Sequence, residues 1–192
     1  LVNPRACRET ELNYNKVLTS KRIAVVGAGP AGISFSITAA QRGHVVSLFE
    51  ESNEIGGQLN FAKMIPGKEE FHGLLNYYKN EIKRLKIDLI TDHKVKTTDL
   101  INFDEIIIST GVVPRKIDIE GQDKVNFVYD YQEVFNDGVK LGNRIAIIGA
   151  GGIGFDVAEY ISSSGISPTL DINKWMEKWG VTDPAIERGG VL

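Results

Sequence analysis

Cysteine is nearly absent from this sequence. Among the 192 residues only Cys7 carries a thiol. A single cysteine excludes an internal disulfide framework, a four-cysteine metal cluster and a C-x-x-C redox pair within the chain. We therefore expect Cys7 to be a small, half-buried side chain rather than a reactive thiol, and we expect a reducing, cytoplasmic setting for the protein.

An excess of positive charge and long hydrophobic runs are also missing. The 22 Lys and Arg residues stand against 25 Asp and Glu residues, which gives a net charge of −3. Nucleic-acid binding requires a basic patch or stripe, so no nucleic-acid partner is expected. No apolar run approaches the ~18–20 residues of a membrane span, so no membrane partner is expected. The sequence begins with neither Met nor a signal peptide, and we expect it to be a piece of a larger protein.

Glycine is plentiful, and much of it gathers in two turns. A β-branched run over residues 22–26 predicts a strand buried on both faces of a parallel sheet. A glycine turn follows, then a helix that runs to about Arg42 and ends at Gly43, then a second strand over residues 44–50. The turn has the pattern G-x-G-x-x-G, formed by Gly27, Gly29 and Gly32. This order of elements is that of one βαβ unit.

Each glycine of the first turn has a physical reason. Gly27 permits the tight turn out of the strand, Gly29 lets a pyrophosphate approach the backbone, and Gly32 lets the helix pack closely on the sheet. The phosphates would then lie at the positive end of the helix dipole. Glu50, at the end of the next strand, is placed to accept hydrogen bonds from a ribose hydroxyl pair. The turn predicts a dinucleotide site, and the alternative is a tight turn in some other α/β protein.

The same pattern recurs about 122 residues downstream. Residues 144–148 predict a strand, and a helix is expected through about Ser163. The turn between them contains Gly149, Gly151 and Gly154. The sequence has no strand and acidic residue after it to complete this second unit. As a repeat of the first turn it predicts a second dinucleotide, and the usual pair is a flavin with the nicotinamide cofactor that reduces it.

Other segments predict the elements around these turns. Apolar residues from Phe71 to Leu85 recur at i, i+3, i+4 and i+7 spacing, which predicts an amphipathic helix. Residues 103–108 predict a strand that ends at Ser109-Thr110-Gly111. Residues 170–179 have a partly helical pattern. Further expectations are extended pieces at 87–91 and 95–97, turns at 120–121 and 137–138, and a connecting arm over residues 1–20.

Three segments together carry a family resemblance. The run Gly27-Ala28-Gly29-Pro30-Ala31-Gly32 resembles the FAD turn of the two-dinucleotide-binding-domain flavoproteins. Glu50 with Ile55-Gly56-Gly57-Gln58 resembles the acidic ribose ligand and double-glycine element of that superfamily, and residues 110–115 resemble its T-G-x-x-P-R segment. The resemblance implies an α/β fold, with a Rossmann-like FAD-binding domain around a central parallel sheet and the start of a second Rossmann-like NAD(P)H-binding domain.

Within this superfamily the sequence most resembles the bacterial NADPH-dependent 2,4-dienoyl-CoA reductase family. The segments that carry this likeness are residues 1–7, 54–58, 65–71 and 151–156. That family is built from an FMN-binding β/α-barrel, a 4Fe–4S cluster, an FAD domain and an NADPH domain. The resemblance implies that residues 1–20 are a connecting arm after an absent iron–sulfur segment. It further implies that residues 21–115 are an incomplete FAD-binding domain and residues 116–192 a linker with the first part of the NADPH-binding domain.

The resemblance also assigns residues to the two cofactors. For FAD it implies Gly27, Gly29, Pro30, Ala31 and Gly32 at the pyrophosphate, Glu50 and Glu51 at the ribose, Gly57 and Gln58 on the flavin side, Val95 at the adenine edge, and Thr110 and Gly111 near the ADP moiety. For NADPH it implies Gly149, Gly151, Gly152, Ile153 and Gly154 at the pyrophosphate. Lys68 is expected to pair either with a phosphate or with a nearby acidic group, and the alternative is a solvated lysine on a Pro-Gly turn. No catalytic residue and no metal ligand is expected within the chain.

The activity implied by the resemblance is NADPH-dependent reduction of 2,4-dienoyl-CoA thioesters. Hydride would pass from NADPH to FAD, and electrons would then pass through the iron–sulfur cluster to FMN. The acyl-CoA substrate would bind the barrel, outside residues 1–192. A disulfide reductase of the same superfamily is disfavoured, because no cysteine follows the double glycine. Two alternatives stay open: the electron-entry segment of a glutamate synthase small subunit, and a nucleotide-binding fragment without turnover.

Overall fold

The computed structural model describes residues 5–136 and 139–190. The chain divides into two compact units. Unit 1 contains Leu1–Leu59 and Leu74–Val112, and unit 2 contains Asn60–Gly73 and Val113–Leu192. The resemblance at residues 1–4, the turn expected at 137–138 and the last two residues lie outside the described part of the chain.

Unit 1 is built on a four-stranded parallel sheet with the order β3-β2-β1-β4. The strands are β1 (Arg22–Val26), β2 (Val45–Phe49), β3 (Asp88–Ile90) and β4 (Glu105–Ile108). In the central pairing, Arg22 of β1 lies opposite Val45 of β2, and Val26 lies opposite Phe49. The strands predicted at residues 22–26, 44–50 and 103–108 are therefore confirmed, and the carboxyl ends of β1 and β2 meet at one edge of the sheet.

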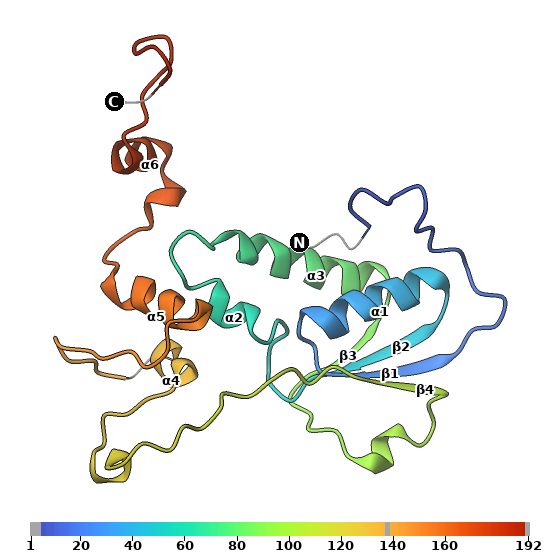
Figure 1. Cartoon of the computed structure of the whole chain (residues 1–192). Coiled ribbons are helices and arrows are strands. Elements are labelled where there is room, and N and C mark those ends of the chain that lie inside the picture. Colours follow the sequence, from blue (N-terminus) through green and yellow to red (C-terminus); the bar gives the residue numbers. More distant parts are fainter. Residues whose placement is uncertain (1–4, 137–138, 191–192) are drawn as a thin grey trace. The chain divides into compact units, whose positions relative to one another are not determined.

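Two helices cover one face of this sheet, as Figure 1 shows. Helix α1 (Pro30–Arg42) ends at Gly43, whose positive φ of 100° is the left-handed conformation that glycine adopts readily. Helix α3 (Glu70–Arg84) buries the apolar stripe predicted from its spacing. The core between helices and sheet includes Ile23, Val25, Ile33, Ile37, Val46, Leu48, Tyr78 and Ile82.

The arm before β1 forms neither helix nor strand in its described residues. It is attached to the end of α1 by three hydrogen bonds, one of which the Arg42 Nε donates to the Asn15 carbonyl at 3.3 Å. The Val17 amide donates to the Arg42 carbonyl at 2.9 Å, and the Ser20 hydroxyl donates to the Gly43 carbonyl at 2.8 Å. The side chain of Cys7 is exposed, so the expectation of a half-buried thiol is wrong. The reason is that Cys7 lies in a surface turn that contributes nothing to the core.

Unit 2 consists of short helices joined by irregular segments. Its elements are most of α2 (Leu59–Ala62), η2 (Gln122–Lys124), α4 (Tyr131–Phe135), α5 (Gly152–Ser162), η3 (Pro168–Leu170) and α6 (Ile172–Trp179). A small core forms around Ile65, Phe135 and Val157. Thus the segment of residues 60–73, which lies between β2 and α3 in the sequence, packs with α4 and α5.

Two expected extended segments are not strands. Residues 144–148 form no strand, and the side chains of Ile145 and Ile148 are 46% and 67% exposed. A β-branched run becomes a strand only when a neighbouring strand satisfies its backbone groups, and no described residue of unit 2 lies in such a strand. Residues 95–97 likewise lie outside the sheet, because the 3₁₀ turn η1 (Thr97–Leu100) begins there.

Candidate functional site

The first glycine turn connects β1 to α1, and neighbouring backbone atoms pack tightly against it at Gly27 and Gly32. Gly27 has a φ of 101°, and its amide donates to the Phe49 carbonyl at 2.8 Å. A Cβ at Gly27 would overlap the backbone carbonyl of Ser109, and a Cβ at Gly32 would overlap the carbonyl oxygen of Gly27. Both positions therefore exclude any side chain, because backbone atoms occupy the space.

The same turn is open at Gly29. A Cβ at Gly29 would meet no atom within 4 Å. Gly29 is the N-cap of α1 without a side-chain hydrogen bond, and Pro30 fills the first helical position. The first amides of α1 thus lack a side-chain cap and lie at the positive end of the helix dipole. This backbone cradle, with Ala31 and Gly32 following, fits a pyrophosphate group such as that of FAD.

Glu50 lies beside this turn, and protein donors hold its carboxylate. The Ala28 amide donates to Oε2 at 2.7 Å. The Ser52 amide and hydroxyl donate to Oε1 at 3.0 and 2.8 Å. A carboxylate has about four acceptor positions, so three are used and Oε2 keeps one for a ribose hydroxyl. The carboxylate is therefore oriented before any ligand binds.

The double-glycine element lies against the first turn. The Gly56 amide donates to the Ala28 carbonyl at 2.8 Å, and a Cβ at Gly57 would lie 3.3 Å from the Cα of Gly29. Ile55, just before it, is buried in the sheet core at 3% exposure. The fold thereby brings Gly57, which Gln58 follows in the sequence, against the backbone of the first turn at Gly29. The sequence pattern alone could not show this contact, because the contacting residues lie 28 positions apart in the chain.

The segment after β3 reaches the far side of Glu50. The His93 amide donates to the Glu50 carbonyl at 2.9 Å. Lys94 forms an exposed ion pair with Glu51 at 2.9 Å, and the hydrogen bond to Glu51 raises the pKa of Lys94. Val95, the expected adenine contact, follows directly and is half-buried. Hence Glu51 pairs with Lys94, while Val95 lies in the same loop as His93, whose amide bonds the Glu50 carbonyl.

Ser109 is a site residue that the sequence reasoning did not assign. Its hydroxyl is 2.9 Å from the carbonyl oxygens of both Val26 and Gly27, and its amide donates to Val26 at 2.8 Å. It thereby fixes the base of the glycine turn. Thr110 follows at the turn itself, and Gly111 has a φ of 74°. Ser52, which donates to the Glu50 carboxylate, was not assigned either, and its place two residues after Glu50 is the available signal.

The second glycine turn repeats the backbone of the first. Gly149 has a φ of 112°. A Cβ at Gly154 would overlap the carbonyl oxygen of Gly149, just as a Cβ at Gly32 would overlap the carbonyl oxygen of Gly27. Gly151 is the N-cap of α5 without a side-chain hydrogen bond, and a Cβ there or on Gly152 would meet nothing within 4 Å. The side chain of Ile153 is 54% exposed. This turn therefore offers an equally open cradle at the start of a helix.

Lys68 belongs to unit 2. Its Nζ forms an ion pair with Oδ1 of Asp156 on α5 at 2.6 Å. Of the two partners expected for Lys68, the structure therefore shows the acidic group. The remaining predicted residues divide between the units: those assigned to FAD lie in unit 1, and those assigned to NADPH, at 149–154, lie in unit 2.

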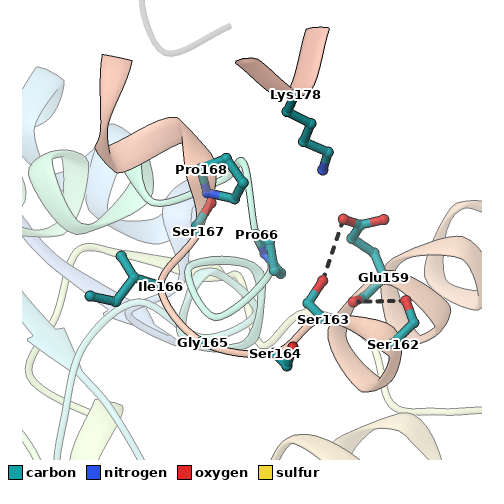
Figure 2. Close-up of a pocket in the computed structure, with 10 residues that line it drawn as sticks. All are labelled: Pro66, Glu159, Ser162, Ser163, Ser164, Gly165, Ile166, Ser167, Pro168 and Lys178. Carbon is teal, nitrogen blue, oxygen red and sulfur yellow. Dashed lines mark hydrogen bonds between the residues drawn. The ribbon is translucent and has the colours of Figure 1, made fainter. Parts of the chain in front are cut away.

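A hollow of about 420 Å³ opens at the carboxyl end of α5 (Figure 2). Glu159 and Lys178 point into it, beside a run of serines at 162–164. No predicted site residue lines it, and it lies at the opposite end of α5 from the glycine turn.

Over the described residues, no group of three or more His, Cys, Asp or Glu side chains could hold a metal ion, and no helix is long and apolar enough to cross a membrane.

Residues 21–180 match the pyridine nucleotide-disulphide oxidoreductase family. The chain belongs to this family. Membership implies a flavoprotein oxidoreductase that binds FAD and a nicotinamide dinucleotide, which is the pair of ligands that the two glycine turns fit. The α/β fold with a parallel sheet and a Rossmann-like dinucleotide-binding arrangement is thereby confirmed.

Several characterised proteins are similar over most of this chain. It is 33% identical over 177 residues to a metal reductase of Desulforamulus reducens, covering 89% of the chain and 26% of that protein. It is 30% identical to a cinnamate reductase of Clostridium sporogenes, covering 88% and 25%. It is also 30% identical to the glutamate synthase [NADPH] small chain of Bacillus subtilis, covering 73% and 32%. The chain thus spans about a quarter of the length of the first two relatives.

Among solved structures, a 2-naphthoyl-CoA reductase in complex with 2-naphthoyl-CoA is similar in fold and sequence. The TM-score is 0.76 at 34% identity, and the match covers 83% of this chain and 24% of that one.

Proposed function

We propose that this chain is the FAD- and NADPH-binding part of an oxidoreductase that reduces 2,4-dienoyl-CoA thioesters. The observation that carries the proposal is the pair of glycine turns with one backbone geometry, each opening a helix that lacks a side-chain cap. Two such turns fit two dinucleotides. The similarity to a cinnamate reductase and a 2-naphthoyl-CoA reductase supports a conjugated acyl substrate.

The chain's own residues would bind and orient the two cofactors. In unit 1, the open backbone at Gly29 would bind the FAD pyrophosphate, and Glu50 would accept a hydrogen bond from the ribose through Oε2. In unit 2, the backbone from Gly149 to Gly154 would bind the NADPH pyrophosphate. When bound, FAD would accept the hydride equivalent of NADPH and release its electrons onward. No side chain of this chain is proposed to transfer a proton to the substrate.

The remaining parts of the reaction are assigned outside residues 1–192. The proposal includes an FMN, a 4Fe–4S cluster and an acyl-CoA site in the whole protein, acting in the cytoplasm without a nucleic-acid or membrane partner. The greater length of the relatives supports this, because the chain covers only about a quarter of them. Cys7 is not proposed as a cluster ligand, because the family resemblance does not place it among the four cluster cysteines.

Steady-state kinetics of the protein that carries this chain, purified with its cofactors, test the proposal. We expect NADPH oxidation to depend on a 2,4-dienoyl-CoA and not on glutamine with 2-oxoglutarate. A protein that binds FAD and NADPH but leaves every dienoyl-CoA unreduced would contradict the substrate while leaving the cofactor assignment in place.

The second candidate is an electron-entry segment of glutamate synthase. The observation that favours it is the 30% identity to a glutamate synthase small chain. In that case NADPH oxidation would follow glutamine and 2-oxoglutarate in the same experiment.

A further inference from the structure

The segment of residues 60–73 packs on the helix of the second glycine turn. Ile65 is 4% exposed and lies in one core with Val157 of α5 and Phe135 of α4. Because Val157 lies on the second turn of α5, this packing places the segment along the phosphate-binding half of the helix. The contact is buried and apolar, so it brings the polar residues that follow Ile65 close to α5.

The side chains of two of those polar residues, Lys68 and Glu69, bond residues from the later part of unit 2. Lys68 forms the 2.6 Å ion pair with Asp156. The Glu69 carboxylate accepts hydrogen bonds from the Thr169 hydroxyl at 2.8 Å and from the Gly67 amide at 3.0 Å. The backbone around Lys68 is therefore held on one side by Ile65 and on the other by Glu69. Lys68 is presented to α5 in a defined position.

The charge on α5 explains why a cation is needed there. The helix carries two carboxylates, Asp156 and Glu159, and no Lys or Arg. Asp156 is the nearer one to the glycine turn, four residues after Gly152, or roughly 6 Å along the helix axis. An uncompensated carboxylate at that distance repels a pyrophosphate and offsets part of the positive potential at the start of the helix. The side chains of Lys68 and Asp156 are 40% and 29% exposed, so water screens the charge only in part.

We propose that Lys68 is a positioning residue for the nicotinamide dinucleotide, although it lies in the stretch of sequence that resembles the FAD domain. It neutralises Asp156 and keeps the start of α5 favourable for a pyrophosphate, without touching the ligand. The inference rests on the proposed binding of NADPH at the second glycine turn. It makes Lys68, for which the sequence left the partner open, a determinant of NADPH affinity.

Titration of NADPH into the purified, FAD-loaded protein tests this inference. We expect Lys68→Met to weaken NADPH binding about three- to tenfold, because Asp156 becomes an uncompensated negative charge near the phosphates. The FAD content should stay at the wild-type value, since the FAD turn belongs to unit 1. Lys63→Met is the matched control: it removes a lysine of the same segment whose Nζ bonds Asn60 at 2.8 Å. We expect the control to bind NADPH as wild type does.

Two further variants distinguish an electrostatic role from a structural one. Lys68→Met with Asp156→Asn should recover most of the lost affinity, and Lys68→Arg should retain it. The loss in Lys68→Met should also shrink with rising salt. Equal NADPH affinity in Lys68→Met and the Lys63→Met control would overturn the inference, as would a double variant as weak as Lys68→Met. A wild-type protein that binds FAD but no NADPH would overturn the proposed function itself.

Discussion

At the scale of single residues, the first glycine turn depends on side chains that come from outside it. The Glu50 carboxylate accepts a hydrogen bond from the Ala28 amide. The Ser109 hydroxyl donates to the carbonyl oxygens of Val26 and Gly27. A hydrogen bond to a charged group contributes about 1.5–3 kcal/mol, and a buried donor left without its partner costs a similar amount. These side chains therefore support the turn as well as any ligand that it binds.

Glu50→Ala should weaken FAD binding by roughly 1–3 kcal/mol, because it removes the ribose acceptor and frees the Ala28 amide. A fluorescence titration of the apoprotein with FAD measures this. Glu54→Ala, an exposed carboxylate in the same loop, is the control and should leave the affinity unchanged. Unchanged FAD affinity in Glu50→Ala would count against the ribose assignment.

Glu69 should make unit 2 sensitive to acid. Burial raises the pKa of Glu69, but hydrogen bonds from Ser167, the Gly67 amide and Thr169 outweigh it and lower the pKa from 4.5 to about 2. A lowered folded-state pKa gives stability that is present above pH 4.5 and is lost as the pH falls towards 2. The carboxylate is partly exposed, so the contribution is about 1 kcal/mol or less after screening by solvent.

Chemical denaturation at several pH values measures this contribution. The two tryptophans, Trp175 and Trp179, both lie in unit 2, so their fluorescence reports on that unit. Glu69→Gln should be less stable than wild type at pH 6, and the difference should vanish as the pH approaches 2. A constant difference over this range would contradict the assigned hydrogen bonds.

At the scale of elements, the two glycine turns separate what a glycine does for folding from what it does for binding. At Gly32 and Gly154 there is no room for a side chain, because a Cβ would overlap the carbonyl oxygen of the first glycine of the same turn. Gly29 and Gly151 face open space and begin their helices. The same element thus contains one glycine that packing requires and one that only a ligand would require.

Gly32→Ala should destabilise unit 1 by about 2 kcal/mol or more, because the backbone of Gly27 leaves no room for a methyl group. Gly29→Ala should cost less than about 1 kcal/mol in stability, the range for a changed N-cap. It should nevertheless weaken FAD binding at least about tenfold, because the methyl group would occupy the place of the pyrophosphate. Thermal unfolding and FAD titration of both variants check this contrast. The contrast would be contradicted if the two variants were equally stable and bound FAD with equal affinity.

The segment at residues 144–148 shows how an element depends on its neighbours. Its β-branched residues match those of β1 in pattern, yet only β1 has parallel partners on both sides. The glycine turn and helix after residue 148 form in either case, because their hydrogen bonds lie within the turn and helix themselves. Local backbone geometry is therefore preserved where the sheet is not.

At the scale of the whole molecule, substrate reduction is proposed to lie outside this chain. The isolated chain of residues 1–192, loaded with FAD, should therefore oxidise no NADPH in response to a 2,4-dienoyl-CoA. An assay of NADPH absorbance with and without the thioester measures this. Turnover by the pure, cofactor-loaded chain would contradict the proposed division of labour.

The sequence by itself determined the elements whose signals are local. The strand, glycine turn and helix from Arg22 to Arg42, the cap at Gly43 and the stripe of α3 follow from backbone freedom and periodicity, which neighbouring residues set. Only the tertiary structure decided the partner of Lys68, the donors to Glu50 and the absence of a strand at 144–148. These depend on contacts between residues far apart in the chain, and a side chain or strand takes whichever partner the fold places beside it.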